Sequence, residues 1–154
     1  MTLRLESPAF APGGRIPDRF TCEGGDASPP LGWSGAPQGT RGYALVCSDP
    51  DAPSGTFYHW AVYDIPAEAH GLAERQRTGE RGGPYVHALN DFGRPGYGGP
   101  CPPRGHGPHR YRFRLYAVDT ARLPIGAHPG CRDVERTAHA HALAEAELVG
   151  TFSR

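Results

Sequence analysis

The sequence predicts a mainly β domain with long loops and one helix near the C-terminus. Several short apolar stretches are bounded by turn residues, which is typical of strands. Glycine and proline number 22 and 17 among 154 residues, so long irregular segments must connect these strands. An alanine-rich segment follows the clearest strand, and this order favours a sheet with a helix packed at one side.

Composition narrows the function classes. Sixteen basic and sixteen acidic side chains give a net charge of zero, which argues against a protein built to bind nucleic acid or an anionic membrane. Every basic residue of this count is an arginine, and the absence of lysine excludes a Schiff base and a P-loop. Aromatic residues are spread along the chain, so we expect residues 1–154 to form a single domain with one core.

The N-terminal third is predicted from short patterns. Residues 2–5 alternate, with Leu3 and Leu5 on one side, and indicate a first strand. Residues 11–40 are dense in Gly, Pro, Ser and Asp, so we expect mostly turns there. The side chains expected to anchor these turns to the core are Phe20, Leu31 and Trp33.

Three longer strands are expected next. The apolar run Tyr43–Cys47 predicts a buried strand, and His59–Ile65 predicts the strand after it. Residues 67–108 are expected to be irregular, interrupted by Tyr85–Leu89. The clearest strand is Tyr111–Val118, because its residues alternate between apolar and polar. Its expected inward face consists of Tyr111, Phe113, Leu115 and Ala117.

The segment from Asp133 to Val149 predicts the helix. Asp133 is a suitable N-cap, alanines dominate the middle, and Gly150 is a suitable residue after the last turn. No apolar stretch is long enough to cross a membrane.

The cysteines and the N-terminus predict the compartment. The four cysteines are Cys22, Cys47, Cys101 and Cys131. None forms a CxxC pair, which argues against a zinc or thioredoxin-type motif. The N-terminal residues show no signal-peptide pattern. We therefore expect reduced thiols and a cytoplasmic protein.

Two candidate functional segments lie where one predicted strand ends and the next begins. Asp49 and Asp51 lie in the sequence Asp-Pro-Asp-Ala-Pro directly after a strand, where the prolines would hold two carboxylates in place. The alternative is a rigid turn, since Asp and Pro are turn residues. His59 begins the next strand, and its alternative is a half-buried, hydrogen-bonded histidine.

The third candidate is the Gly/Pro-rich segment 93–111. Its alternative is a mobile surface loop. Its glycines would let backbone amides approach an anion, and its prolines would stiffen it. His109 precedes the strand and could donate a hydrogen bond to that anion, with Tyr111 on the same side. His106 and His109 also form an HxxH spacing, which by itself is not specific.

Taken together, these segments resemble the phosphatidylethanolamine-binding protein (PEBP) family, in its bacterial Raf-kinase-inhibitor-like branch. The resemblance spans essentially the whole chain, because the family's motifs occur in order. They are SPAF at 7–10, FTCEGGDASPPLGW at 20–33, DPDAP at 49–53, HW at 59–60, NDFGRPGYGGPCPP at 90–103, GPHRYRFRLYAVD at 107–119 and the closing LVGTFSR.

The resemblance implies a PEBP-like fold, in which a large antiparallel sheet packs on a smaller one, with peripheral helices including a short C-terminal helix. It also implies a small pocket that binds anions, including the phosphate groups of lipid heads. The residues that match the pocket motifs are Asp49, Asp51, His59, Cys101, Pro102, His109 and Tyr111. A homodimer is implied because bacterial members often pair, and no cofactor is implied.

The leading hypothesis is a non-enzymatic protein that binds a phosphate-bearing or other small anionic ligand. Regulation of a protein partner, such as a kinase, is compatible with this hypothesis as a second role. The kinase-inhibiting role of animal relatives does not transfer directly, because this chain lacks their long C-terminal helix. The alternative is a metal-assisted hydrolase or lyase that uses Asp49, Asp51, His59 and His109. A third hypothesis is a pure interaction module with a vestigial pocket.

The charge of the pocket leads to a further expectation. Two aspartates would repel a phosphate unless protonated histidines offset them or a carboxyl carries a proton. A histidine beside a carboxylate has a raised pKa. We therefore expect anion binding to strengthen at mildly acidic pH.

Overall fold

Five antiparallel strands form the larger of two sheets in the computed structural model, which describes residues 2–76 and 85–154. Across this sheet the strand order is β6-β4-β3-β7-β8. In chain order its strands are β3 (Gly42–Asp49), β4 (Phe57–Pro66), β6 (Val86–His87), β7 (His109–Val118) and β8 (Ala142–Phe152). The smaller sheet has the order β1-β2-β5 and consists of β1 (Arg4–Glu6), β2 (Leu31–Ser34) and β5 (Gly71–Leu72). The helices of the described part are a 3-10 turn, η1 (Asp18–Phe20), and α1 (Cys131–Ala140).

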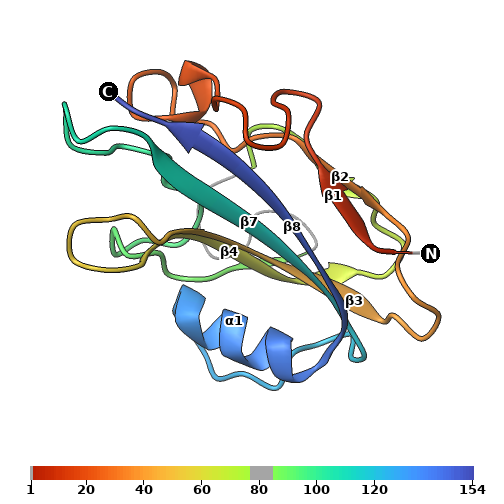
Figure 1. The fold of residues 1–154 in the computed structure, drawn as a ribbon. Coiled ribbons are helices and arrows are strands. Elements are labelled where there is room, and N and C mark those ends of the chain that lie inside the picture. The colour runs from red at the N-terminus through yellow and green to blue at the C-terminus, as the bar shows by residue number, and fades with distance from the viewer. Residues whose placement is uncertain (1, 77–84) are drawn as a thin grey trace.

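Different layers cover the two faces of the larger sheet (Figure 1). The smaller sheet lies over one face, where β1 contacts β8, and α1 packs against β3, β4 and β7 on the other. Each face therefore has its own hydrophobic core, and the central strand β3 is buried along its whole length. This architecture confirms the predicted fold class.

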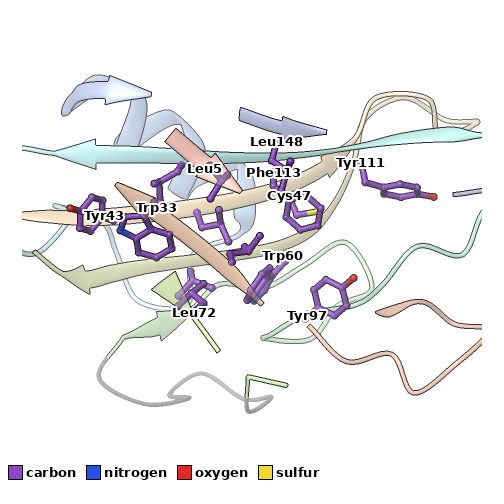
Figure 2. Packing of buried hydrophobic residues seen from close by; sticks show 14 of the residues in the cluster. Leu5, Trp33, Tyr43, Cys47, Trp60, Leu72, Tyr97, Tyr111, Phe113 and Leu148 are labelled. Atoms are coloured by element: carbon purple, nitrogen blue, oxygen red, sulfur yellow. The ribbon is translucent and has the colours of Figure 1, made fainter. Parts of the chain in front are cut away.

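Strand β7 shows how the alternation of side chains builds both cores. Tyr111, Phe113 and Leu115 point into the core between the two sheets, as the sequence predicted. Tyr116 and Val118 point to the opposite face, where α1 packs. The core between the sheets also holds both tryptophans, as Figure 2 shows. The C-terminal end of β7 carries apolar residues on both faces, so both layers pack against it and hold the strand in the middle of the molecule.

The prediction of a helix from Asp133 to Val149 is wrong in its extent. Helix α1 begins earlier, after Gly130, and the carboxylate of Asp133 accepts a hydrogen bond from the Gly130 backbone N–H at 3.0 Å. The helix ends at Ala140, and the remaining residues form the long strand β8. In β8 every second residue from Ala144 to Phe152 faces the core, while the glutamates between them face out. Pairing with β7 along its length outweighs the helix preference of alanine and glutamate.

Elsewhere the elements follow the predictions, with short additions. Leu3 and Leu5 are buried around the first strand, and Phe20 is buried in the turn segment. Trp33 lies on β2, and this strand and β5 were not predicted because each has only a few residues among turn formers. No helix in residues 2–76 and 85–154 is long and apolar enough to span a membrane.

Candidate functional site

A cavity of about 220 Å³ opens where β3 ends and β4 and β7 begin. Because β3 is antiparallel to both neighbours, its last residues and their first residues lie at the same edge of the sheet. The residues that line the cavity are Asp49, Ala52, Pro53, Phe57, His59, Phe92, Cys101, Pro102, Pro103, His109 and Tyr111. Most of the wall is apolar, and the polar groups come from the three strands.

Asp49 and His109 form a buried pair at this edge. Their side chains are 5% and 3% exposed, and His109 Nδ1 lies 2.6 Å from Asp49 Oδ2. A carboxylate can only accept, so Nδ1 of His109 carries the proton and donates it. The other carboxylate oxygen of Asp49 accepts the backbone N–H of Asp51 at 2.7 Å. The Asp49 carboxylate therefore accepts hydrogen bonds from these two donors, which partly compensate its negative charge.

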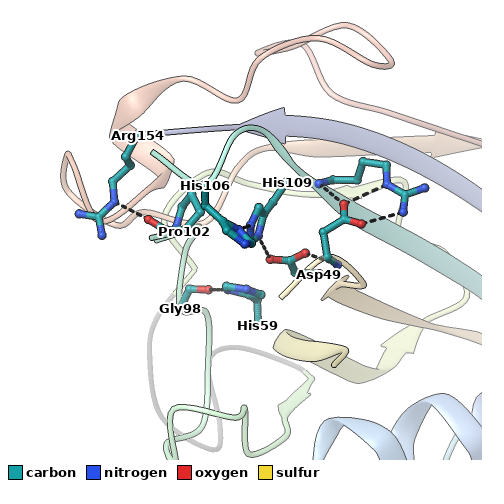
Figure 3. Close-up of polar contacts among 9 residues, drawn as sticks. Asp49, His59, Gly98, Pro102, His106, His109 and Arg154 are labelled. Atoms are coloured by element: carbon teal, nitrogen blue, oxygen red, sulfur yellow. Dashed lines mark hydrogen bonds and ion pairs between the residues drawn. The ribbon is translucent and has the colours of Figure 1, made fainter. Parts of the chain in front are cut away.

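His106 extends this pair toward the surface. Its Nδ1 lies 2.5 Å from Nε2 of His109. Figure 3 shows the two rings side by side, with Asp49 beyond His109. Two nitrogen lone pairs would repel at this distance, so one proton must lie between the rings. The HxxH spacing that carried no specific prediction thus places His106 in direct contact with a predicted pocket residue.

His59 is buried and held in one tautomer. Its Nδ1 lies 2.7 Å from the carbonyl oxygen of Gly98, so Nδ1–H donates and Nε2 keeps its lone pair. Burial lowers the pKa of His59 below its ordinary value, although the Gly98 carbonyl and Asp49 oppose this shift. The expectation of raised histidine pKa values is therefore wrong for His59, which is neutral and accepts hydrogen bonds near pH 7.

Tyr111 supplies a hydroxyl group at the same end of the sheet. The ring is buried, and its oxygen points away from the hydrophobic cluster (Figure 2). Burial and the nearby charge of Asp49 raise the pKa of the Tyr111 phenol well above its ordinary value. The group stays protonated, and its O–H, which is hydrogen-bonded to Asp49, can donate to a ligand oxygen that takes the place of that carboxylate.

Asp51 does not line the cavity, although the sequence grouped it with Asp49. Its carboxylate accepts the backbone N–H and two guanidinium N–H groups of Arg110, at 2.8–2.9 Å. These bonds lower the pKa of Asp51 to about 2. The residue therefore ties the turn after β3 to the start of β7. Asp49 and Asp51 would point to the same side only if the strand continued through Asp51. Strand β3 ends at Asp49, and the following residues form a turn.

The expectation that all cysteines are reduced is wrong. Cys22 and Cys101 form a disulfide across 79 residues, while Cys47 and Cys131 are free and buried. Sequence spacing could not reveal this pair, because the loop that carries Cys101 folds back onto the loop that carries Cys22. Disulfides persist in oxidising compartments, so the argument from cysteines for a cytoplasmic location is removed.

The Gly/Pro-rich loop forms a cavity wall but uses its glycine amides internally. The N–H of Gly98 donates to the carbonyl of His59 at 3.0 Å, and the N–H of Gly99 donates to Asp26 at 2.9 Å. The expected nest of free amides is therefore absent at these two residues. Cys101 and Pro102, two of the residues that match the family's pocket motifs, lie on the wall of the cavity.

Aromatic side chains at the cavity mouth were not predicted as site residues. Phe57 and Phe92 pack edge-on, with ring centroids 4.8 Å apart, and both contact the ring of His59. Phe92 is also 43% exposed, which is unusual for so large an apolar group. The only sequence signal was the position of Phe57, two residues before His59 on the same side of the strand.

The geometry gives the metal-assisted alternative no support. Asp51 is bound to Arg110, and Asp49 is bound to His109. Within the described ranges, no group of three or more His, Cys, Asp or Glu side chains is arranged to hold a metal ion.

Comparison with known proteins supplies the context for this cavity. A family model described as phosphatidylethanolamine-binding protein matches residues 6–153. A UPF0098 protein of Aquifex aeolicus is 45% identical over 154 residues, which cover 99% of this chain and 89% of that relative. The lipoprotein candidate LppC of Mycobacterium tuberculosis is 45% identical over 151 residues, covering 97% of this chain and 72% of the relative.

Two solved structures have the same fold. Escherichia coli YbcL, described as a new member of the mammalian PEBP family, superimposes with a TM-score of 0.92 at 33% identity, covering 100% of this chain and 99% of YbcL. The PEBP homolog CT736 of Chlamydia trachomatis gives a TM-score of 0.88 at 34% identity, covering 99% of this chain and 98% of CT736.

Proposed function

Because the chain belongs to the phosphatidylethanolamine-binding protein family, we propose that it is a non-enzymatic protein that binds a small anionic ligand bearing a phosphate group. The observation that carries this proposal is the cavity in which the Asp49–His109 pair, His59 and Tyr111 converge. A largely apolar cavity in which a few polar groups converge is typical of a ligand-binding site.

The size of the cavity limits the ligand. Its volume of about 220 Å³ is below the roughly 300–1,000 Å³ of pockets that hold drug-sized molecules. A phosphate group with a short substituent, such as a lipid head group, fits this space, whereas a whole phospholipid does not. The aromatic side chains Phe57 and Phe92 at the mouth would contact the apolar part that leaves the cavity.

The hydrogen-bonding groups favour a ligand that brings a proton of its own. Tyr111 donates to an anionic oxygen, and neutral His59 accepts from a P–OH group or an ammonium group. A phosphate monoester carries a P–OH proton only below its second pKa of about 6, so the form that can donate to His59 becomes more abundant at lower pH. We therefore expect affinity to rise as the pH falls from 8 to 6.

Calorimetric titration of metal-stripped protein with phosphorylethanolamine at pH 6 and pH 8 tests this proposal. We expect binding at pH 6, weaker binding at pH 8, and a loss of about tenfold in Tyr111→Phe, which removes one hydrogen bond to a charged group. His139→Ala is the control, because its exposed side chain pairs with Glu145 far along the sheet from the cavity. Binding that needs added zinc or iron, or equal affinity for the wild type and Tyr111→Phe, would contradict the proposal.

A homodimer and a regulated protein partner remain predictions from the family resemblance. Light scattering that gives twice the 16.5 kDa mass of one chain would support the dimer, and a mass of one chain would remove it.

A further inference from the structure

His109 has no hydrogen-bonding atom left for a ligand in this structure. Its Nδ1 donates to Asp49 at 2.6 Å, and its Nε2 contacts Nδ1 of His106 at 2.5 Å. A ligand that uses His109 must therefore take the place of the His106 ring at Nε2.

The exposure of His106 and its two glycine neighbours favour displacement of its side chain from His109. The residue is exposed, in contrast to His109, which is 2% exposed. It lies between Gly105 and Gly107, which both have positive φ angles, of 76° and 86°. A Cβ added at either glycine would have no atom within 4 Å beyond its chain neighbours, so the outer side of both glycines is open.

The base of the same loop is anchored. The backbone N–H of Gly105 donates to the carbonyl of Arg154 at 3.1 Å, and the Arg154 side chain donates to the carbonyl of Pro102 at 2.8 Å. These bonds hold the cavity wall while the His106 side chain changes rotamer. The movement required is therefore confined to the exposed side chain of His106.

We propose that His106 is a placeholder that binds Nε2 of His109 beside the cavity and is displaced from it when an anion binds. This inference rests on the proposed function, because it assigns a competitor to the same site. His106 satisfies the buried Nε2 of His109 in the free protein, and the ligand takes over that bond. Ligand binding therefore has to break one internal hydrogen bond before it forms its own.

The variant His106→Ala separates this role from a direct contact with the ligand. Removing the competitor is expected to tighten the binding of inorganic phosphate about five- to tenfold at pH 6, the equivalent of one hydrogen bond. If His106 instead donates to the phosphate, the same variant binds more weakly. His139→Ala, again the control, is expected to bind like the wild type.

Calorimetry with inorganic phosphate, combined with NMR of the imidazole nitrogens, gives the readout. In the wild type we expect the His106 nitrogen signals to move to the values of a free, solvated ring as phosphate is added. Binding by the wild type that is unchanged or weaker in His106→Ala would overturn the placeholder alone. Absence of binding to the wild type and to His106→Ala would overturn both the placeholder and the phosphate site.

Discussion

His87 makes the fold sensitive to acid, and its replacement should remove that sensitivity. The side chain is 1% exposed, and its Nδ1 accepts the indole N–H of Trp60 at 3.2 Å. The neutral ring must then carry its proton on Nε2, which has no hydrogen-bond partner among the described residues. Burial lowers the pKa of His87 from 6.5 to about 4. A charged His87 ring would be even less stable in this position, because no carboxylate in residues 2–76 and 85–154 offsets its charge.

The size of the effect follows from the difference in pKa between the folded and unfolded chains. Between pH 6.5 and pH 4 the unfolded chain binds a proton at His87 and the folded chain does not, so stability falls as the pH falls. A difference of about 2.5 pKa units corresponds to about 3 kcal/mol of unfolding free energy lost across this window. Above pH 6.5 both states are neutral at His87, and the full stability is present.

Urea denaturation of the wild type and His87→Phe from pH 7 to pH 4.5 measures this loss. Phenylalanine keeps the ring stacking on Trp60, whose centroid lies 6.3 Å away, but leaves the indole N–H without an acceptor. We expect the variant to be less stable by about 1–2 kcal/mol at pH 7. It should recover about 2–3 kcal/mol relative to the wild type at pH 4.5. His59 also has a lowered pKa, but it is present in both proteins and cancels in the difference. Parallel curves of stability against pH for the two proteins would show that His87 does not cause the loss of stability in acid.

Three further predictions concern the segments around the cavity. Asp51→Asn should cost about 1 kcal/mol at pH 7, because the bonds to Arg110 are partly exposed, and this deficit should vanish as the pH falls from about 4 to 2; a deficit that persists in urea denaturation at pH 2 would contradict the assignment. Replacing Cys22 and Cys101 together by serine should lower the unfolding free energy by about 2–4 kcal/mol, because a loop of 79 residues is no longer closed; a melting temperature that does not respond to a thiol reductant in the wild type would argue against the bond. Gly99→Ala should cost about 2 kcal/mol or more and weaken phosphate binding, because a Cβ there would collide with the backbone of the loop before Cys22; normal stability in denaturation would show that the two loops are not packed as described.

Most of the fold could be predicted because strong local patterns agreed with the tertiary structure. The alternation in β7 and the continuous apolar run in β3 specify strands buried on one or both faces. Residues 142–149 carried two compatible patterns, since alanine and glutamate favour a helix while their alternation suits an edge strand. Pairing with β7 decides between them, and this partner is distant in the sequence.

The site was predictable where strand ends determine it. Asp49 ends β3, while His59 and His109 lie at the starts of its antiparallel neighbours, so the three side chains meet. Asp51 could not be placed, because its position depends on a turn and on the side chain of Arg110. His106 could not be assigned either, since its contact with His109 depends on the path of a glycine-rich loop that no local pattern specifies.

A crystal structure of the protein with phosphorylethanolamine at pH 6 tests the phosphate site most directly. We expect the phosphate group to lie in the cavity, with its oxygens within hydrogen-bond distance of the Tyr111 hydroxyl and His59 Nε2. We also expect the His106 ring to have left His109. A phosphate bound elsewhere on the molecule, or a cavity that holds only solvent at saturating phosphorylethanolamine, would contradict the proposed phosphate site.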